Sequence, residues 1–305
     1  MVVTWRGAEH IGRCLDAVAA QRRPHRTIVV DNASEDGTAE LIAAHPSAPQ
    51  VLRLHKNAGY AGGIAAALAI VGTRYVAWLN DDAEPSADWL SLLEDALDGD
   101  ENAAAASARL ERADGTTQSM GVRLTGDGYG FDLNGVTADT NVFGFCGGAA
   151  LLRADALRAA GGVPAEFFCY YEDTDTSWRL RLAGWRVLAV PAAGVRHTHG
   201  ASSRLGSADF HLWNERNRLL MLLRCAPAAV AARECASFAA ITALLPVRRL
   251  LRRGVVAPTP NFRLSLRLRA LAGVARRLPA ALRARRDAPI TVSRRDLWRR
   301  WAGRP

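Results

Sequence analysis

"YVAWLNDDAEP", residues 75–85, starts as an apolar run and ends in three adjacent polar side chains, Asn80, Asp81 and Asp82. Its aromatic and β-branched residues predict a strand. Two neighbouring carboxylates repel each other, and burial penalises their charge further. A cation or a polar ligand at the end of the strand would compensate that charge, so this stretch predicts a binding site.

Three similar apolar runs precede it, and helix-like stretches separate them. The runs are "MVVTW" (1–5), "RTIVVDN" (26–32) and "VLRLHKN" (51–57), and the stretches between the strands cover residues 8–21, 37–44 and 62–71. Alternating strands and helices are typical of a parallel sheet with right-handed crossovers. The sequence therefore predicts an α/β fold.

Polar side chains stand at the end of each predicted strand, namely Thr4, Asp31, Lys56–Asn57 and the Asn80–Asp82 group. In open α/β sheets, ligands bind beyond the carboxyl ends of the strands. Because parallel strands end at the same edge of a sheet, these clusters predict one shared site.

After residue 85 the alternation of strands and helices is less clear. Residues 101–145 are rich in Gly and Asp, which predicts extended, partly exposed strands and loops. "EDTDTSWRLRLAGW" (172–185) predicts a helix with Gly184 as its C′ residue. "RVLAVP" (186–191) predicts a last strand, and "VRHTHG" (195–200) follows it.

Two clusters carry candidate metal ligands. Asp81 and Asp82 offer the oxygen atoms that Mg²⁺ and Mn²⁺ prefer, usually together with substrate phosphates. A neutral imidazole of His197, with His199 as the alternative, could complete the coordination shell. The residues alone also allow a surface turn before a helix and a structural histidine bonded to a loop.

A third cluster holds Glu172, Asp173 and Asp175 within four residues. At a helix N-terminus the helix dipole partly offsets their charge, so all three could be capping carboxylates. Alternatively, one of them is a general base whose basicity is tuned by its neighbours.

The net charge of +9 averages two unlike parts of the chain. Residues 247–305 contain 17 arginines and two acidic side chains, whereas residues 1–246 contain 22 basic and 28 acidic side chains. An acidic body thus carries a strongly basic tail.

The tail combines apolar and basic residues at helical spacing. Residues 226–246 are mostly apolar and carry only two charges, Arg233 and Glu234, which leaves uncharged stretches shorter than the roughly 20 residues that span a bilayer. Further along, a leucine stripe is flanked by arginines: Leu264, Leu268, Leu271, Leu278 and Leu282 among Arg263, Arg267, Arg276, Arg277 and Arg283. This pattern favours re-entrant or interfacial helices at an anionic membrane surface. A helix packed on the body with a solvated basic face is the alternative.

Other features narrow the class of protein. The basic region contains no recognisable nucleic-acid-binding module, so we expect no nucleic acid partner. The five cysteines form no CxxC pair, which indicates reduced thiols in a cytosolic setting. No signal peptide precedes the first strand, and "MVVTW" looks like the end of a strand that is either unusually short or begins at a misassigned start codon.

Taken together, these segments resemble the family 2 inverting glycosyltransferases with the GT-A fold, and among them the rhamnosyltransferase-like branch. The resemblance covers roughly residues 1–205 and is carried by "VVTW", "VVDNASEDGT", "NAGYAGG", "WLNDDAEP", "GFCGGAALLRADAL", "FFCYYEDTDTSWRLRLAGWRV" and "VRHTHGAS", in the order of the family. It implies a mostly parallel GT-A sheet flanked by helices in a catalytic domain of residues 1–208. Residues 209–305 would be a helical, Arg-rich, membrane-associated extension.

The resemblance also implies roles on the donor side. Asp31 would bond the base of a nucleoside diphosphate-sugar, and Thr4 and Asn57 would help to line the donor pocket. Asn80 and Asp81 would lie near the ribose and phosphates. A divalent cation, Mg²⁺ or Mn²⁺, would be bound by Asp82 and His197.

On the acceptor side, Asp173 matches the base of the family, and Glu172 would orient the acceptor or share the proton. The implied reaction is inverting transfer of a sugar, with TDP-rhamnose as the first candidate donor, to a hydroxyl of a saccharide or polyprenyl-linked saccharide. The protein would act in cell-envelope polysaccharide synthesis, peripherally, on the cytoplasmic side of the plasma membrane.

Some residues depart from the family pattern. Arg6 replaces the usual Asn after "TW", Ile64–Ala67 replace a second Asn-Gly continuation, and "VPAEFF" stands where Phe-Asp-Glu is common. A non-catalytic nucleotide-sugar-binding or scaffold protein at the membrane is therefore the alternative. A nicotinamide oxidoreductase is disfavoured because "WRGAEHIG" lacks the GxGxxG turn.

Overall fold

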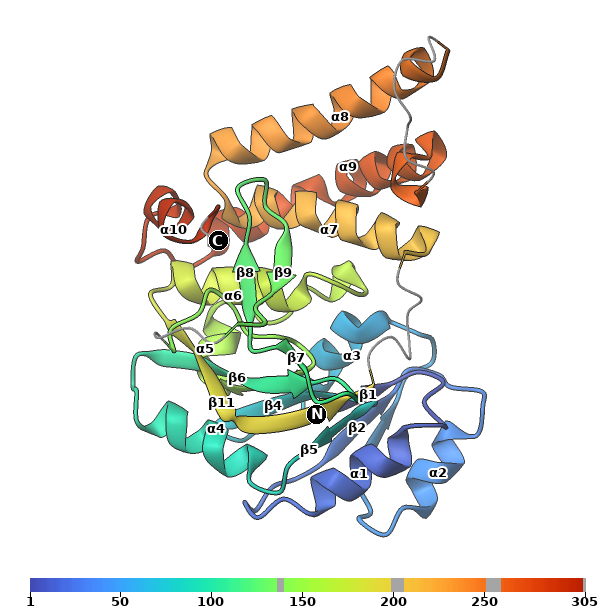
Figure 1. The fold of residues 1–305 in the computed structure, drawn as a ribbon, viewed down its shortest axis with the longest axis vertical. Coiled ribbons are helices and arrows are strands. Elements are labelled where there is room, and N and C mark those ends of the chain that lie inside the picture. Colours follow the sequence, from blue (N-terminus) through green and yellow to red (C-terminus); the bar gives the residue numbers. More distant parts are fainter. Residues whose placement is uncertain (136–139, 199–205, 251–258, 304–305) are drawn as a thin grey trace.

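The computed structural model describes residues 1–135, 140–198, 206–250 and 259–303. Figure 1 shows a central sheet with helices on both faces and a further layer of C-terminal helices beyond one of them. His199 lies outside the described residues. The predicted α/β class with a helical extension is confirmed.

The strands of the large sheet lie in the order β3-β2-β1-β4-β10-β6-β11-β5, β7 pairs with β6, and β8 and β9 form a separate two-stranded sheet. Their bounds are β1 Val2–Thr4, β2 Ile28–Asp31, β3 Gln50–Arg53, β4 Tyr75–Asn80, β5 Ala83–Pro85, β6 Ala103–Glu111, β7 Thr117–Ser119, β8 Val122–Leu124, β9 Gly130–Asp132, β10 Ala149–Arg153 and β11 Arg186–His197.

The helices form layers around this sheet (Figure 1). Their bounds are α1 Ile11–Ala19, α2 Thr38–Ala44, α3 Gly59–Leu68, α4 Trp89–Asp98, α5 Ala154–Ala159, α6 Glu172–Leu182, α7 Ala208–Cys225, α8 Ala228–Leu250, α9 Leu264–Asp287 and α10 Arg294–Trp301, with 3₁₀ turns η1 Ala165–Phe167 and η2 Pro260–Phe262. Apolar residues of α1, α2 and α4 pack on one face of the sheet. Those of α3, α5 and α6 pack on the other.

Strands β3, β2, β1 and β4 are parallel, as the alternating pattern predicts. Successive side chains of a strand point to opposite faces, so Val2 and Val29 join the core on one side while Val3 and Val30 join the core on the other. Both faces of β1, β2 and β4 are covered, which explains why these strands read as continuous apolar runs, whereas the edge strand β3 is largely exposed.

Strand β6 corrects the prediction of partly exposed strands in residues 101–145. It lies between β10 and β11, and its residues 103–108 are completely buried. Five of these six residues are alanine, and their small side chains allow helices to pack closely on both faces of the sheet. Large apolar residues are missing from this stretch, so its hydrophobicity did not identify it as a central strand.

The C-terminal helices share a third core with the sheet domain. Trp178 and Leu182 of α6 pack with Leu219 and Leu222 of α7 and with Leu266 of α9. Helix α8 is the outermost of these helices in Figure 1. The extension is thus joined to the sheet domain through a continuous apolar contact.

Asp175 adds a buried ionic link between the same helices. Its carboxylate is fully buried and accepts hydrogen bonds from Nε of Arg179 on its own helix at 2.7 Å, while Nε of Arg224 on α7 lies 2.8 Å away. Two guanidinium groups balance one carboxylate, so burial of the charge is compensated. Of the three acids that begin α6, Asp175 is therefore structural.

The leucine stripe of α9 is only partly exposed. Leu268 and Leu282 are exposed, whereas the buried face of this helix consists of other residues, including Leu266, Ala270 and Val274. Arg267 is buried and donates from Nε to Thr242 Oγ1 of α8 at 2.9 Å. The basic side chains of the tail therefore divide into exposed ones and ones that hold the helices together.

Candidate active site

The carboxyl ends of β1, β2 and β4 bring the predicted donor-side residues to one edge of the sheet. Thr4 lies opposite Asp31 in the register of β1 and β2, and Val3 lies opposite Asn80 in that of β1 and β4. Asp81 follows directly. These side chains meet because parallel strands in register end together.

The candidate metal pair is formed by two strands that run side by side. Strand β5 pairs antiparallel with β11 and places Ala83 opposite His197. Asp82 directly precedes β5, and its Oδ1 atom lies 3.1 Å from Nε2 of His197. The Nδ2 atom of Asn80 is 3.1 Å from the same imidazole nitrogen.

Gln118 contacts the other nitrogen of this imidazole and so orients the ring. Its Oε1 atom is 2.9 Å from Nδ1 of His197, which favours the tautomer with the proton on Nδ1. The single lone pair of Nε2 then accepts from Asn80, and the carboxylate of Asp82 lies beside it. Two electron-pair donors thus face each other in a buried position, an arrangement that suits a cation between them.

Asp81 occupies the side of the site next to β1. Burial raises its pKa to about 6, and a hydroxyl contact from Thr4 offsets part of this shift. A Cβ atom on Gly7 would lie 2.3 Å from Thr4 Oγ1 and 2.6 Å from Asp81 Oδ2. Gly7 therefore allows the backbone to close over this carboxylate, which the sequence reading did not notice.

Asp31 and Asn57 lie on the other side of β1. Asp31 is buried, accepts from the backbone N–H of Ser34 at 2.9 Å, and has Nε of Arg53 at 3.4 Å. Asn57 accepts from the backbone N–H of Gly59 at 2.8 Å and so fixes the start of α3. Asn32, missed in the sequence reading, clamps the same turn by donating to the Gly59 carbonyl.

Asp173 lies in the first turn of α6 and is held by three donors. The backbone N–H of Gly147 donates to Oδ2 at 2.9 Å, and the backbone N–H and the hydroxyl of Thr174 donate to Oδ1. Burial nevertheless raises its pKa, because these hydrogen bonds compensate only part of the desolvation.

Glu172 shares the low-polarity environment of Asp173. Burial, and secondarily the charge of Asp173, raise its pKa to about 8. Its Oε2 atom is buried and has no hydrogen-bond partner among the described residues. At neutral pH Glu172 is therefore largely protonated.

The turn at Gly147–Gly148 connects the metal pair, Asp82 and His197, with the acid pair, Glu172 and Asp173. The carbonyl of Gly148 accepts from the backbone N–H of Asn80 at 3.0 Å, and Gly147 donates to Asp173. A Cβ on Gly147 would lie 3.2 Å from the Cβ of Asp173, so a larger residue there would press on that side chain. The hydroxyl of Tyr60 on α3 donates to the Gly147 carbonyl at 2.6 Å and braces the turn.

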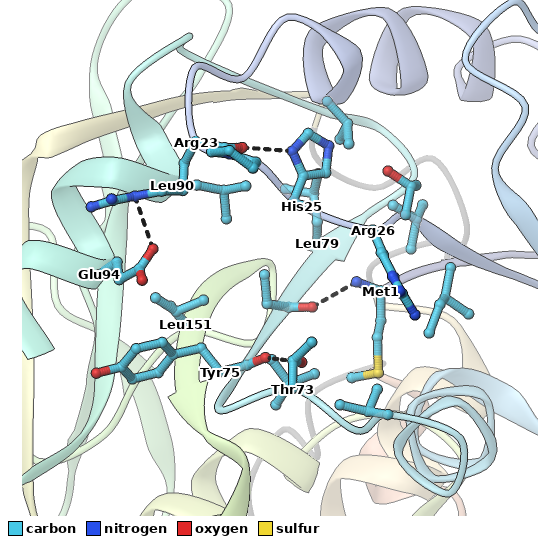
Figure 2. Close-up of a pocket in the computed structure, with 18 of the residues that line it drawn as sticks. Met1, Arg23, His25, Arg26, Thr73, Tyr75, Leu79, Leu90, Glu94 and Leu151 are labelled. Carbon is cyan, nitrogen blue, oxygen red and sulfur yellow. Dashed lines mark hydrogen bonds and ion pairs between the residues drawn. The ribbon is translucent and has the colours of Figure 1, made fainter.

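A separate cavity of about 580 Å³ lies at the opposite edge of the sheet. Figure 2 shows Met1, Arg23, Tyr75 and Glu94 around it, at the amino ends of the strands. None of the predicted site residues lines it. It is therefore not the site that the strand-end side chains form.

Comparison with known proteins supports the family suggested by the sequence. The model of glycosyl transferase family 2 matches residues 1–161. The chain belongs to glycosyl transferase family 2. This family 2 protein is 26% identical over 243 residues to an N-acetylglucosaminyl-diphospho-decaprenol L-rhamnosyltransferase of Mycobacterium tuberculosis, with 70% of this chain and 79% of the relative covered. It is also 40% identical over 93 residues to the galactofuranosyltransferase GlfT1 of Mycolicibacterium smegmatis, with 29% of this chain and 30% of that relative covered.

Solved structures agree on the fold. The mannosyltransferase PcManGT of Pyrobaculum calidifontis, in complex with GDP-Man and Mn²⁺, superposes with a TM-score of 0.56 at 19% identity, covering 90% of this chain and 85% of that one. TarS residues 1–349 of S. aureus, in complex with UDP, give a TM-score of 0.52 at 18% identity, covering 77% and 67%. The predicted GT-A type fold of this family 2 glycosyltransferase is confirmed.

The tertiary structure adds residues that no strand-end pattern identifies. Gln118 orients His197, and Tyr60 holds the backbone of Gly147. Neither side chain carries a charge that would single it out in the sequence. The adjacent glycines of "GFCGGAALL" were the available signal for Gly147, because adjacent glycines often mark a close approach of the backbone.

The raised pKa of Glu172 predicts how stability depends on pH. Between pH 4.5 and about 8 the native state holds a proton that the unfolded state has lost, so the free energy of unfolding falls as the pH rises through this window. Glu172→Gln removes that contribution. We expect the melting temperature of the variant, relative to the unmodified protein, to increase from pH 5 to pH 8 and then level off.

Asp155→Asn on α5, an exposed acid, is the control and should show no such trend. Melting curves of Glu172→Gln that shift in parallel with those of the unmodified protein across this range would contradict the assignment.

Proposed function

We propose that the protein transfers a sugar, with inversion, from a nucleoside diphosphate-sugar to a hydroxyl of a saccharide acceptor. The observation that carries this proposal is the link through Gly147–Gly148, which places the Asp82–His197 pair and the Glu172–Asp173 pair at adjoining positions. The Asp82–His197 pair suits the leaving group, and the Glu172–Asp173 pair suits the attacking hydroxyl. The proposed catalytic domain covers residues 1–208.

On the donor side, Asp31 would bind the base, and Thr4, Asn57, Asn80 and Asp81 would line the path of the ribose and phosphates. Similar folds were solved with GDP-Man and Mn²⁺ or with UDP, which supports a nucleotide-sugar at this edge of the sheet. We take TDP-rhamnose as the first donor to test, because the relative in Mycobacterium tuberculosis is a rhamnosyltransferase.

The residues fit a divalent cation, Mg²⁺ or Mn²⁺. A carboxylate oxygen of Asp82 and an imidazole nitrogen of His197 face each other, and both are ligand types that Mn²⁺ accepts. Among the described residues no group of three or more His, Cys, Asp or Glu side chains could hold a metal, so phosphates and water would supply the other ligands. A cation bound there would neutralise the charge that develops on the diphosphate.

On the acceptor side, Asp173 acts as the general base. Its carboxylate accepts the proton of the acceptor hydroxyl while that oxygen bonds to the anomeric carbon, and the bond from this carbon to the diphosphate oxygen breaks. Attack opposite to the leaving group inverts the configuration. Protonated Glu172 can donate a hydrogen bond that orients the acceptor, and its neutrality avoids a second charge beside the base.

The acceptor we propose is a polyprenyl diphosphate-linked saccharide used in cell-envelope polysaccharide synthesis. The name of the relative in Mycobacterium tuberculosis supports this class. Such an acceptor lies in a membrane, so we place the protein peripherally on the cytoplasmic side of the plasma membrane.

The C-terminal helices offer a surface for an anionic membrane. Helix α8 is long and apolar enough to cross a membrane by length and composition alone, and most of its apolar stretch is exposed. Leu244 and Val247 are 47% and 49% exposed. Exposed arginines such as Arg269 and Arg276 lie on the neighbouring helix α9, so apolar insertion and attraction to lipid phosphates could act together.

Replacing the proposed base tests the reaction. We expect Asp173→Asn to lower the rate of sugar transfer at least 1,000-fold, within the range that general base catalysis supplies, while donor affinity changes little. Transfer from TDP-rhamnose to a synthetic N-acetylglucosaminyl diphosphate lipid measures the rate, and Asp155→Asn is the control. Retained turnover in Asp173→Asn would contradict the base assignment. Donor binding by the unmodified protein without transfer would instead favour a non-catalytic binding protein.

Thermal shift tests the metal pair. A ligand that binds only the folded state raises the melting temperature, so TDP-rhamnose should stabilise the protein more with Mn²⁺ than without it. We expect Asp82→Asn and His197→Gln to lose this Mn²⁺-dependent increment, and Asp88→Asn, an exposed acid elsewhere, to keep it. An undiminished increment in both variants would exclude the assigned ligands.

Vesicle flotation tests the membrane surface. The double variant Leu244→Asp and Val247→Asp should lose binding to vesicles containing anionic lipid, because it places charge on the inserted face. Leu41→Asp on α2, a similarly exposed leucine, should bind normally. Binding that is unchanged in the double variant would rule out this face.

A further inference from the structure

The loop that leads into the acid pair has an unusual backbone. Phe168, Tyr170 and Tyr171 all have φ of 70°, in the left-handed region that L-residues rarely adopt. Phe168 also has ψ of −64°, and the Cys169 N–H donates to the Phe167 carbonyl at 2.8 Å. These values describe the rare, strained form of the γ-turn. Such a conformation persists only where its surroundings enforce it.

Helix α7 supplies that constraint through one buried amide. The Nδ2 atom of Asn217 donates to the carbonyls of Phe167, Cys169 and Tyr170 at 2.9, 2.9 and 2.8 Å. An amide nitrogen has two hydrogens, so at least one of them is shared between two carbonyls. Arg216 donates to Oδ1 of Asn217 and also to the Phe167 carbonyl, which fixes the orientation of the amide.

The other side of the loop contacts helix α3, on the donor side of the site. The Phe168 carbonyl accepts from the backbone N–H of Ala61 on α3 at 3.0 Å. A Cβ on Gly59 would lie 2.2 Å from that carbonyl oxygen, so the loop and the start of α3 are in close contact. The loop then continues directly into Glu172 and Asp173. It is therefore held between α3 and α7 immediately before the proposed base.

This backbone groups four half-buried aromatic rings beside the acid pair. The Phe168 and Trp213 rings are 4.8 Å apart, and the Tyr170 and Phe210 rings are 5.1 Å apart in an edge-to-face arrangement. Tyr170 and Trp213 are 6.4 Å apart, which joins the two pairs. All four side chains retain solvent exposure. The C–H faces of a sugar ring carry partial positive charge and complement the negative faces of aromatic rings.

We propose that helix α7 completes the acceptor side of the active site. Asn217 is a positioning residue that holds the strained loop, and Phe168, Tyr170, Phe210 and Trp213 form the surface on which the sugar ring of the acceptor stacks. This inference rests on the proposed function. It places an essential part of the site beyond residue 208, in the extension.

Kinetics of Trp213 variants test the aromatic surface. With TDP-rhamnose and a synthetic N-acetylglucosaminyl diphosphate lipid, Trp213→Ala should raise the KM for the acceptor about tenfold and leave the KM for the donor within about twofold, because one stacking contact contributes on this order. Trp213→Phe should restore most of the affinity. Asn214→Ala, on the same helix, removes only a bond to the Phe210 carbonyl and should behave like the unmodified protein.

Asn217→Asp tests the positioning role with a side chain of the same shape that cannot donate. We expect kcat to fall at least tenfold while the thermal shift caused by TDP-rhamnose is retained, since the donor half stays folded. An unchanged acceptor KM in Trp213→Ala together with an unchanged kcat in Asn217→Asp would overturn this inference and leave the proposed function intact. Absence of transfer by the unmodified protein would overturn both.

Discussion

The burial of several carboxylates at one edge of the sheet is the constraint on which the rest of the site depends. Removal from water raises the pKa of Asp81, Glu172 and Asp173, and the nearby backbone N–H and hydroxyl donors offset only part of this cost. The site therefore favours whatever adds positive charge, either a proton or a cation. The proposed displacement of a diphosphate by an acceptor hydroxyl requires both: a base with raised proton affinity, and neutralisation of the leaving group.

In helix α6, position within the first turn separates the proposed base, Asp173, from a structural acid, Asp175. Asp173 faces the Gly147 turn, where a glycine allows the backbone to come close, and the donors to its carboxylate are backbone N–H groups and a hydroxyl. Asp175 points to the opposite side, where Arg179 and Arg224 balance it. The two acids therefore differ because the helix turns one towards the Gly147 turn and the other towards α7.

The basic extension has two physical roles that its composition does not distinguish. Arg216, Arg224 and Arg267 are buried and donate to backbone carbonyls, a carboxylate or a hydroxyl within the protein. Other arginines of α9 are exposed, as is the apolar face of α8. The extension is thus part of the folded unit, and its first helix, α7, reaches the loop before Glu172 and Asp173.

The sequence by itself determined the parallel strands, the edge at which the site lies and the residue types gathered there, because strand periodicity and strand-end polarity are local properties. Only the tertiary structure decided that the alanine-rich β6 is central and that Gln118 orients His197. The same holds for the contacts of Tyr60 and Asn217 with the loops around Asp173. These depend on contacts between residues far apart in the chain, made through uncharged side chains and glycine backbone, and such contacts leave no periodic or compositional signal.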